Sequence, residues 1–196
     1  MIVEIQTSLG TVRVEVLSDA APKATEWFLS LVDQKIFDGT QFYRAGHLAG
    51  QVNRPRFLEG GALSPFLLAE TAGRPTTVAE TGLPQFSEWE RTDQTGLRHV
   101  RGSVSLARDI VGDGRAAPDL FIALEPIPEM DAGGGYSPQN TGFPIIGQVI
   151  EGMDLVDAIA ASPRTGETYI PLLTGQILNE PVRIDRIVRI PVDGAA

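Results

Sequence analysis

The feature that most constrains the fold of this chain is a series of short apolar runs separated by turn-forming residues. The 196 residues include 21 Gly and 14 Pro, nearly a fifth of the total, and this punctuation leaves little room for long helices. Four apolar runs bounded by Gly, Pro or Asp cover residues 104–107, 120–124, 145–150 and 182–190. Runs of this length with such boundaries predict β-strands, so we expect a mostly β chain whose strands form a barrel or a sandwich.

The first seventeen residues add the clearest strand pattern. Val12, Val14 and Val16 alternate with Arg13 and Glu15, and a similar apolar run precedes them across the turn at residues 8–10. A period of two with one polar face is typical of strands that bury one side against a core. Residues 2–17 are therefore predicted to form a hairpin.

Two segments have the periodicity of amphipathic helices. Pro22 occupies a position that a first helical turn tolerates, and apolar residues follow at helical spacing to about Gln34. A second helical pattern begins at Met153 and ends near Ser162-Pro163. Three long segments, 45–55, 64–95 and 132–144, show neither period and are expected to be functional loops.

Composition limits the classes of partner. The formal net charge of -9 disfavours nonspecific binding to nucleic acid or to an anionic membrane surface, and no stretch is long and apolar enough to span a bilayer. With no Cys and only His47 and His99, a structural zinc site is not expected, and His99 is interpreted as a structural residue. We expect a single domain over residues 1–196 and a monomer. The compartment is cytoplasmic if Met1 is the native start and periplasmic if a signal peptide has been removed.

Four segments carry a family resemblance when they are read in order. They are Phe-Asp-Gly-Thr-Gln-Phe-Tyr-Arg at 37–44, Gly-Ser-Val-Ser-Leu-Ala-Arg at 102–108, Asp-Leu-Phe-Ile at 119–122 and Gly-Gln-Val-Ile-Glu-Gly-Met-Asp at 147–154. Together they resemble the cyclophilin family of peptidyl-prolyl cis-trans isomerases over nearly the whole chain. Residues 94–99 and the Ser-Leu-Ala-Arg run are most similar to a bacterial branch of that family.

The resemblance implies a fold and an activity. The fold would be a closed antiparallel eight-stranded β-barrel capped by two α-helices. The activity would be cis-trans isomerisation of X-Pro bonds in peptides and unfolded proteins, which assists protein folding and needs no cofactor. Amide resonance sets a rotation barrier of ~18–20 kcal/mol, so a catalyst needs only to hold the twisted bond better than either planar isomer.

The resemblance also implies catalytic and substrate-binding residues. Arg44 matches the catalytic arginine, whose guanidinium can stabilise the prolyl nitrogen as that nitrogen regains its lone pair. An isolated arginine after a strand is ordinarily a surface ion-pair partner, and the order of the four segments favours the catalytic interpretation. Phe121 matches the aromatic floor of the proline pocket. The expected substrate-binding residues are Phe57, Leu106, Ala107, Arg108, Met130 and Phe143.

Several positions depart from the family pattern towards acidic side chains. Glu59, followed by two glycines, stands where the family has a glutamine, and it either orients Arg44 or neutralises it. Gln51 is an alternative for the lost glutamine. Asp119 replaces a groove-shaping glutamine, and Glu129 stands where the family has an aromatic. Phe143 lies nearest to the place of the family's active-site histidine.

Two other functions remain open at this level. An Arg44–Glu59 pair that blocks the site would make the chain a binding module for Pro-containing partners, acting as a chaperone or scaffold with little catalysis. A barrel that binds a small molecule in an interior cavity is the third reading. A large gain of activity on Glu59→Gln would indicate a decayed site, and a deep closed cavity would favour the third.

Overall fold

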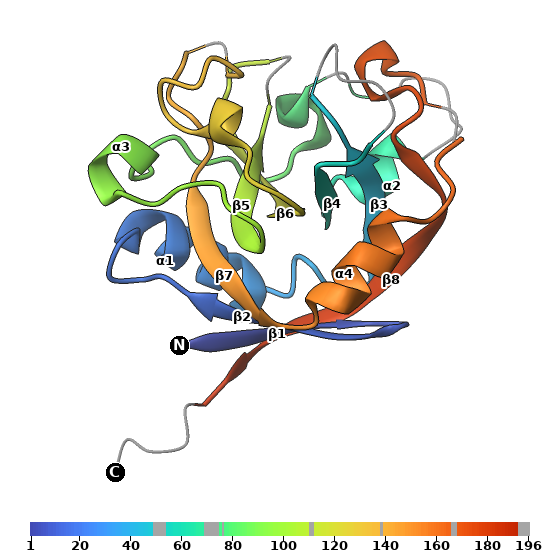
Figure 1. Ribbon diagram of the computed structural model, residues 1–196, viewed down its shortest axis with the longest axis horizontal. Helices are drawn as coiled ribbons and strands as arrows, with labels where there is room; N and C mark the ends of the chain where they lie inside the picture. The colour runs from blue at the N-terminus through green and yellow to red at the C-terminus, as the bar shows by residue number, and fades with distance from the viewer. Residues whose placement is uncertain are drawn as a thin grey trace.

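The computed structural model describes residues 1–48, 54–68, 75, 77–109, 112–137, 139–165 and 168–191. Eight antiparallel strands in these ranges close into a barrel in the order β1-β2-β7-β5-β6-β4-β3-β8 (Figure 1). The strands are β1 (Ile2–Thr7), β2 (Gly10–Val16), β3 (Gln41–Gly46), β4 (Phe57–Gly61), β5 (Ser103–Arg108), β6 (Ala116–Ala123), β7 (Ile145–Glu151) and β8 (Ile177–Ile190). The closed eight-stranded barrel predicted from the resemblance is confirmed.

The N-terminal hairpin is formed by β1 and β2 as the alternation predicts. Ile5 pairs with Val12 across the two strands, and both side chains are fully buried in the barrel core. Arg13, on the opposite face of β2, instead donates to Glu4 at 3.0 Å. Gly10 begins β2 with a φ of 147°, a conformation that L side chains rarely adopt.

Two helices cover the barrel. Helix α1 (Pro22–Asp33) packs against β7 and β8, and α4 (Met153–Ala160) packs against β2, β3 and β4 (Figure 1). The Glu90 carboxylate accepts the backbone N–H groups of Lys23 and Ala24 at the start of α1, which satisfies two donors that have no partner within the helix. Both predicted helices are confirmed.

The segment expected to be irregular, 64–95, contains short helical turns. They are α2 (Ser64–Leu67), α3 (Thr92–Thr95) and the 3-10 turn η1 (Val78–Thr81), and two further 3-10 turns are η2 (Pro128–Met130) and η3 (Pro171–Leu173). Each spans three or four residues, too few to produce a recognisable helical period in the sequence. None of the helices in the described ranges is long and apolar enough to cross a membrane.

The interior of the barrel is filled by apolar side chains. Phe42, Leu58, Leu106, Leu120 and Ile122 are all fully buried there, in one cluster with residues from the other strands and both long helices. These apolar side chains pack against one another in the described interior, so the structure does not favour the interior ligand site that the small-molecule reading requires. The candidate site lies instead outside this core, where residues of β3, β4, β5 and β6 and of the long connections line a groove. Figure 1 shows the long connections gathered towards the upper end of the barrel.

Candidate functional site

A bulge in β3 turns two consecutive side chains out of the barrel. Phe42 pairs with Gly60 and Arg44 pairs with Glu59, so Tyr43 is an extra residue opposite β4. Phe42 therefore faces the core, whereas Tyr43 and Arg44 both face the groove outside it. A Cβ at Gly60 would lie 2.6 Å from the Phe42 Cα, so the strand that carries Glu59 needs glycine at this position.

Arg44 is held from several sides in a buried position. Its Nη1 donates to Glu59 Oε2 at 2.6 Å, while Nε and Nη2 donate to Gln176 Oε1 at 3.0 and 2.8 Å. The guanidinium carbon lies 4.9 Å from the centre of the Phe57 ring, and Tyr136 lies close enough for its hydroxyl to interact electrostatically with the same guanidinium. Burial alone would lower the pKa of Arg44, but the Glu59 carboxylate raises it above its ordinary value. Arg44 is therefore a fixed cation whose long side chain has little freedom left to lose.

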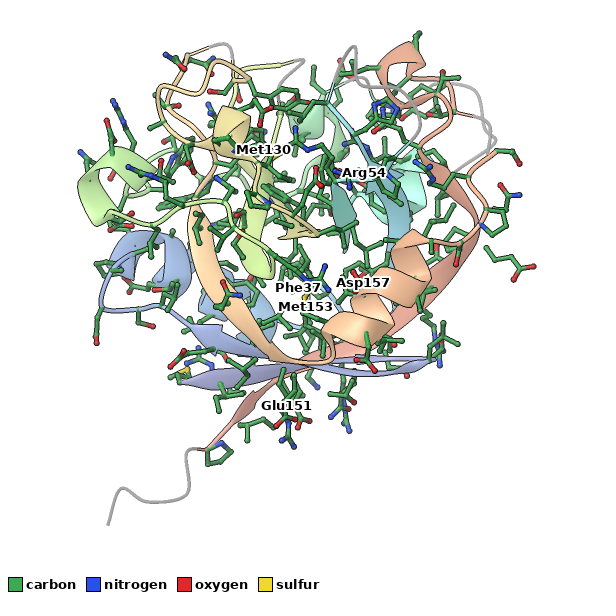
Figure 2. All side chains as sticks on the ribbon, in the orientation of Figure 1. Phe37, Arg54, Met130, Glu151, Met153 and Asp157 are labelled. Atoms are coloured by element: carbon green, nitrogen blue, oxygen red, sulfur yellow. The ribbon has the colours of Figure 1, made fainter. Side chains whose placement is uncertain are left out.

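An apolar pocket of aromatic rings lies beside this cation. The Phe121 ring centre is 5.5 Å from those of both Phe57 and Phe143, tilted by 60° to the first and 86° to the second. Met130 belongs to the same buried cluster, and Figure 2 places it at the loop-bearing end of the barrel, opposite Glu151. Together with Arg44 and Glu59, these side chains line a groove of about 110 Å³.

His99 supports the pocket from beneath. Its ring stacks on Phe121 with centres 5.7 Å apart, and its Nδ1 lies 2.7 Å from the Asp131 carboxylate. Burial of Asp131 works against ionisation, but the hydrogen bonds from His99 keep the pKa of that carboxyl below its ordinary value. The structural role predicted for His99 is confirmed, and the described residues contain no group of three or more potential metal ligands.

The structure brings most of the expected site residues into one groove. Its lining includes Arg44, Glu59, Phe57, Phe121, Ala107, Arg108, Met130 and Phe143. Leu106 differs, because strand alternation along β5 turns it into the barrel core, where it is fully buried. Gln51 lies outside the described residues.

Arg108 is expected to bind substrate, but its contacts show that it holds two loops in place. Nε and Nη1 donate to the carbonyl oxygens of Gly114 and Gly142, both at 2.7 Å, and Nη2 donates to Gln139 at 2.8 Å. The guanidinium also lies 4.7 Å from the centre of the Trp89 ring. Burial lowers the pKa of Arg108 to about 10, because its acceptors are neutral. Arg108 thus contributes a fixed wall to the groove.

Two residues around the Arg44 guanidinium are absent from the sequence-based prediction. Gln176 accepts from Arg44 in the turn just before β8, 132 positions along the chain, and Tyr136 lies near the guanidinium in the connection before β7. Neither residue stands in a recognisable motif, so no signal in the sequence indicates its role. Glu129 in turn does not line the groove and accepts from Arg56 Nη1 at 3.0 Å.

Comparison with known proteins identifies the family. The model for cyclophilin type peptidyl-prolyl cis-trans isomerases matches residues 2–188. A peptidyl-prolyl cis-trans isomerase of Acinetobacter baylyi is 26% identical over 191 residues, which cover 97% of this chain and 84% of the relative. The cyp18 isomerase of Streptomyces antibioticus is 27% identical over 157 residues, covering 80% and 81%.

Solved structures share the same fold. A cyclophilin type isomerase of Cryptosporidium parvum, crystallised in the presence of the dipeptide Ala-Pro, superposes with a TM-score of 0.67 at 17% identity and covers 97% of this chain and 99% of its own. The cyclophilin AquaCyp293 of Hirschia baltica gives 0.56 at 15% identity, covering 95% and 73%. Since the family model spans the whole barrel, from β1 into β8, this chain belongs to the cyclophilin family of peptidyl-prolyl cis-trans isomerases.

Proposed function

We propose that this isomerase accelerates rotation about X-Pro bonds with Arg44 as its catalytic residue. The observation that carries the proposal is a buried guanidinium, fixed by Glu59 and Gln176, at the edge of an apolar pocket. As the amide twists, the prolyl nitrogen regains a lone pair, and a nearby N–H donor stabilises that state more than either planar isomer. Because Arg44 is already ordered, little reorganisation accompanies the reaction.

The pocket supplies positioning for this step. Phe121 forms the floor for the proline ring, and Phe57, Met130, Phe143 and Ala107 form the walls. Burying a proline ring against these side chains fixes the rotating bond relative to the guanidinium, which is the contribution that orientation makes to catalysis.

Glu59 serves as the residue that orients Arg44. Its carboxylate accepts from one end of the guanidinium while Gln176 accepts from the other, so the plane of the guanidinium is fixed at two points. Glu59 thus stands in place of the family's glutamine as a charged acceptor. Its carboxylate also partly neutralises the positive charge that Arg44 presents to the substrate.

The substrates are extended Pro-containing segments of peptides and unfolded proteins. The groove continues from the proline pocket along Leu63, Phe66, Ile170 and Leu173, which can accept apolar residues next to the proline. The Ala-Pro dipeptide named for the Cryptosporidium relative supports this substrate class.

Residues 1–196 are proposed to act as one domain and as a monomer. Support comes from the family match over residues 2–188 and from the scatter of the exposed large apolar side chains, which include Leu9, Val100, Ile150 and Leu172 on separate segments. Single exposed apolar side chains of this kind are ordinary on the surface of a monomer.

The test compares wild type with Arg44→Ala in a protease-free NMR exchange assay on a short Ala-Pro peptide. Loss of one preorganised donor is expected to lower kcat/KM about 10²- to 10³-fold. Arg183→Ala is the control, because Arg183 lies on β8 with an exposed side chain that pairs with Asp185. An Arg44→Ala variant that folds and retains the wild-type rate would contradict the catalytic assignment.

A further inference from the structure

A second buried carboxyl group lies behind Glu59. Asp119, on β6, is fully buried, and its Oδ2 lies 2.8 Å from the Tyr43 hydroxyl. The same hydroxyl lies 3.4 Å from Glu59 Oε1, and Asp119 Oδ1 accepts the backbone N–H of Leu63 at 2.8 Å. Arg44, Glu59, Tyr43 and Asp119 therefore form one continuous chain of contacts outside the barrel.

The number of protons in this chain is limited. A tyrosine hydroxyl has a single proton and can donate to only one carboxylate at a time. If both carboxyl groups were ionised, one of the two contacts of Tyr43 would join oxygen atoms with no hydrogen between them. The two contacts can both be hydrogen bonds only when one of the carboxyl groups carries a proton.

The charges decide which carboxyl group is protonated. The charged and titratable groups that face Asp119 are Glu59 from β4 and Tyr43 and Arg44 from β3, while Tyr136 acts on the Arg44–Glu59 pair from the connection before β7. Arg44 is the one cation in this set, and its ion pair is with Glu59. Burial and the repulsion by Glu59 raise the pKa of Asp119 well above its ordinary value. Burial and the two acids also raise the pKa of Tyr43, which keeps its own proton.

We propose that Asp119 and Tyr43 are positioning residues of the isomerase: protonated Asp119 donates to the Tyr43 oxygen, and the Tyr43 hydroxyl then donates to Glu59 and holds its carboxylate against Arg44. The inference rests on the proposed role of Arg44 and Glu59. In this arrangement both Glu59 oxygens are hydrogen-bonded, and the buried cluster carries no net charge. Ionisation of Asp119 redirects the Tyr43 proton away from Glu59 and adds a negative charge near the guanidinium.

This arrangement predicts how activity depends on Asp119 and Tyr43. The kcat/KM of the wild type falls at least fivefold as pH rises through the titration of Asp119, since contacting charged groups of this kind are coupled by about 1 kcal/mol or more. Asp119→Asn abolishes this fall, because its amide N–H donates to the Tyr43 oxygen at every pH. Tyr43→Phe lowers kcat at least fivefold with little change in KM, because its ring keeps the packing and loses only the hydroxyl.

The experiment measures kcat/KM against pH for the wild type, Asp119→Asn, Tyr43→Phe and Asp157→Asn, together with the carboxyl carbon signal of Asp119 by NMR. Asp157 lies on α4 with a half-exposed side chain, so Asp157→Asn removes the same charge at a distance and keeps the wild-type profile (Figure 2).

An Asp119 signal that shows an ionised carboxyl at neutral pH, or a folded Tyr43→Phe variant with the wild-type kcat, would overturn the inference. If the wild type were inactive at every pH, the proposed function would fail instead, and the NMR titration would still decide whether Asp119 is protonated.

Discussion

Replacement of Glu59 by Gln separates the two effects that its carboxylate has on Arg44. The amide oxygen of Gln can still accept from Arg44 Nη1, and Gln176 still holds Nε and Nη2, so the orientation of the guanidinium is retained. What is lost is the negative charge. The variant should therefore be less stable than the wild type and also more active.

The two magnitudes follow from the geometry. The side chains of Arg44 and Glu59 are 10% and 9% exposed, so solvent screens their ion pair only weakly. Removing one charge of this buried ion pair while its hydrogen bond is kept costs about 1–2 kcal/mol, or about 2–8 °C in Tm for a chain of this size. In the transition state the prolyl nitrogen carries about half a negative charge, roughly 7 Å from the Glu59 carboxylate. Removing the repulsion between them stabilises the transition state by about 1 kcal/mol at an effective dielectric constant near 20, which is roughly a fivefold rise in kcat/KM.

Thermal unfolding and the NMR exchange assay measure these two effects in the same samples. Glu125→Gln is a matched control. Glu125 accepts from the buried Arg56 at a distance of 2.7 Å, and neither residue lines the groove, so this variant should change stability without changing the rate. A folded Glu59→Gln variant with a tenfold lower rate would refute the reasoning, because the carboxylate charge would then be required for catalysis.

Four further outcomes are expected. Arg44→Lys keeps the charge but should still lower kcat/KM about 10²-fold in the exchange assay, because an ammonium group cannot contact both Glu59 and Gln176 as the guanidinium does. A wild-type rate would show that the charge alone suffices. Phe121→Ala should raise KM and destabilise the fold by about 3–5 kcal/mol in urea, and a loss below 1 kcal/mol would contradict its place in the packed floor. Gln176→Ala should lower kcat/KM about tenfold, since it leaves two Arg44 N–H groups without an acceptor, and an unchanged rate would show that Glu59 alone orients the guanidinium. The free energy of unfolding, measured in urea, should fall by about 1.4 kcal/mol per pH unit between the ordinary pKa of Asp and the raised pKa of Asp119, because in that interval Asp119 is protonated only in the folded state. This slope should be absent in Asp119→Asn.

Local patterns in the sequence determine much of the architecture. The alternation of Val12, Val14 and Val16 requires one buried face, and the structure buries all three. The helices near Pro22 and Met153 begin where a tolerated proline and an apolar period indicate them. These features depend on neighbouring residues and on burial of one face, so they can be predicted without knowing what each element packs against.

The family motifs identify most of the residues that line the site, but they do not place every one of them correctly. Arg44, Phe121 and most of the expected lining residues meet in one groove, as the resemblance implies. Leu106 does not line it, since a shift of one position along a strand reverses the face that a side chain occupies. The sequence places Leu106 beside Ala107, and only the register of β5 separates their environments.

What the sequence by itself determined is therefore the barrel, its two long helices and the family, all of which follow from local periodicity and ordered motifs. Only the tertiary structure decided the environment of Arg44. Glu59, Gln176 and Tyr136 come from three distant segments, and the bulge that turns Tyr43 towards Asp119 has no signature in the residues around it. Electrostatic interactions depend on distance in space and on burial, and neither quantity exists until the barrel has closed.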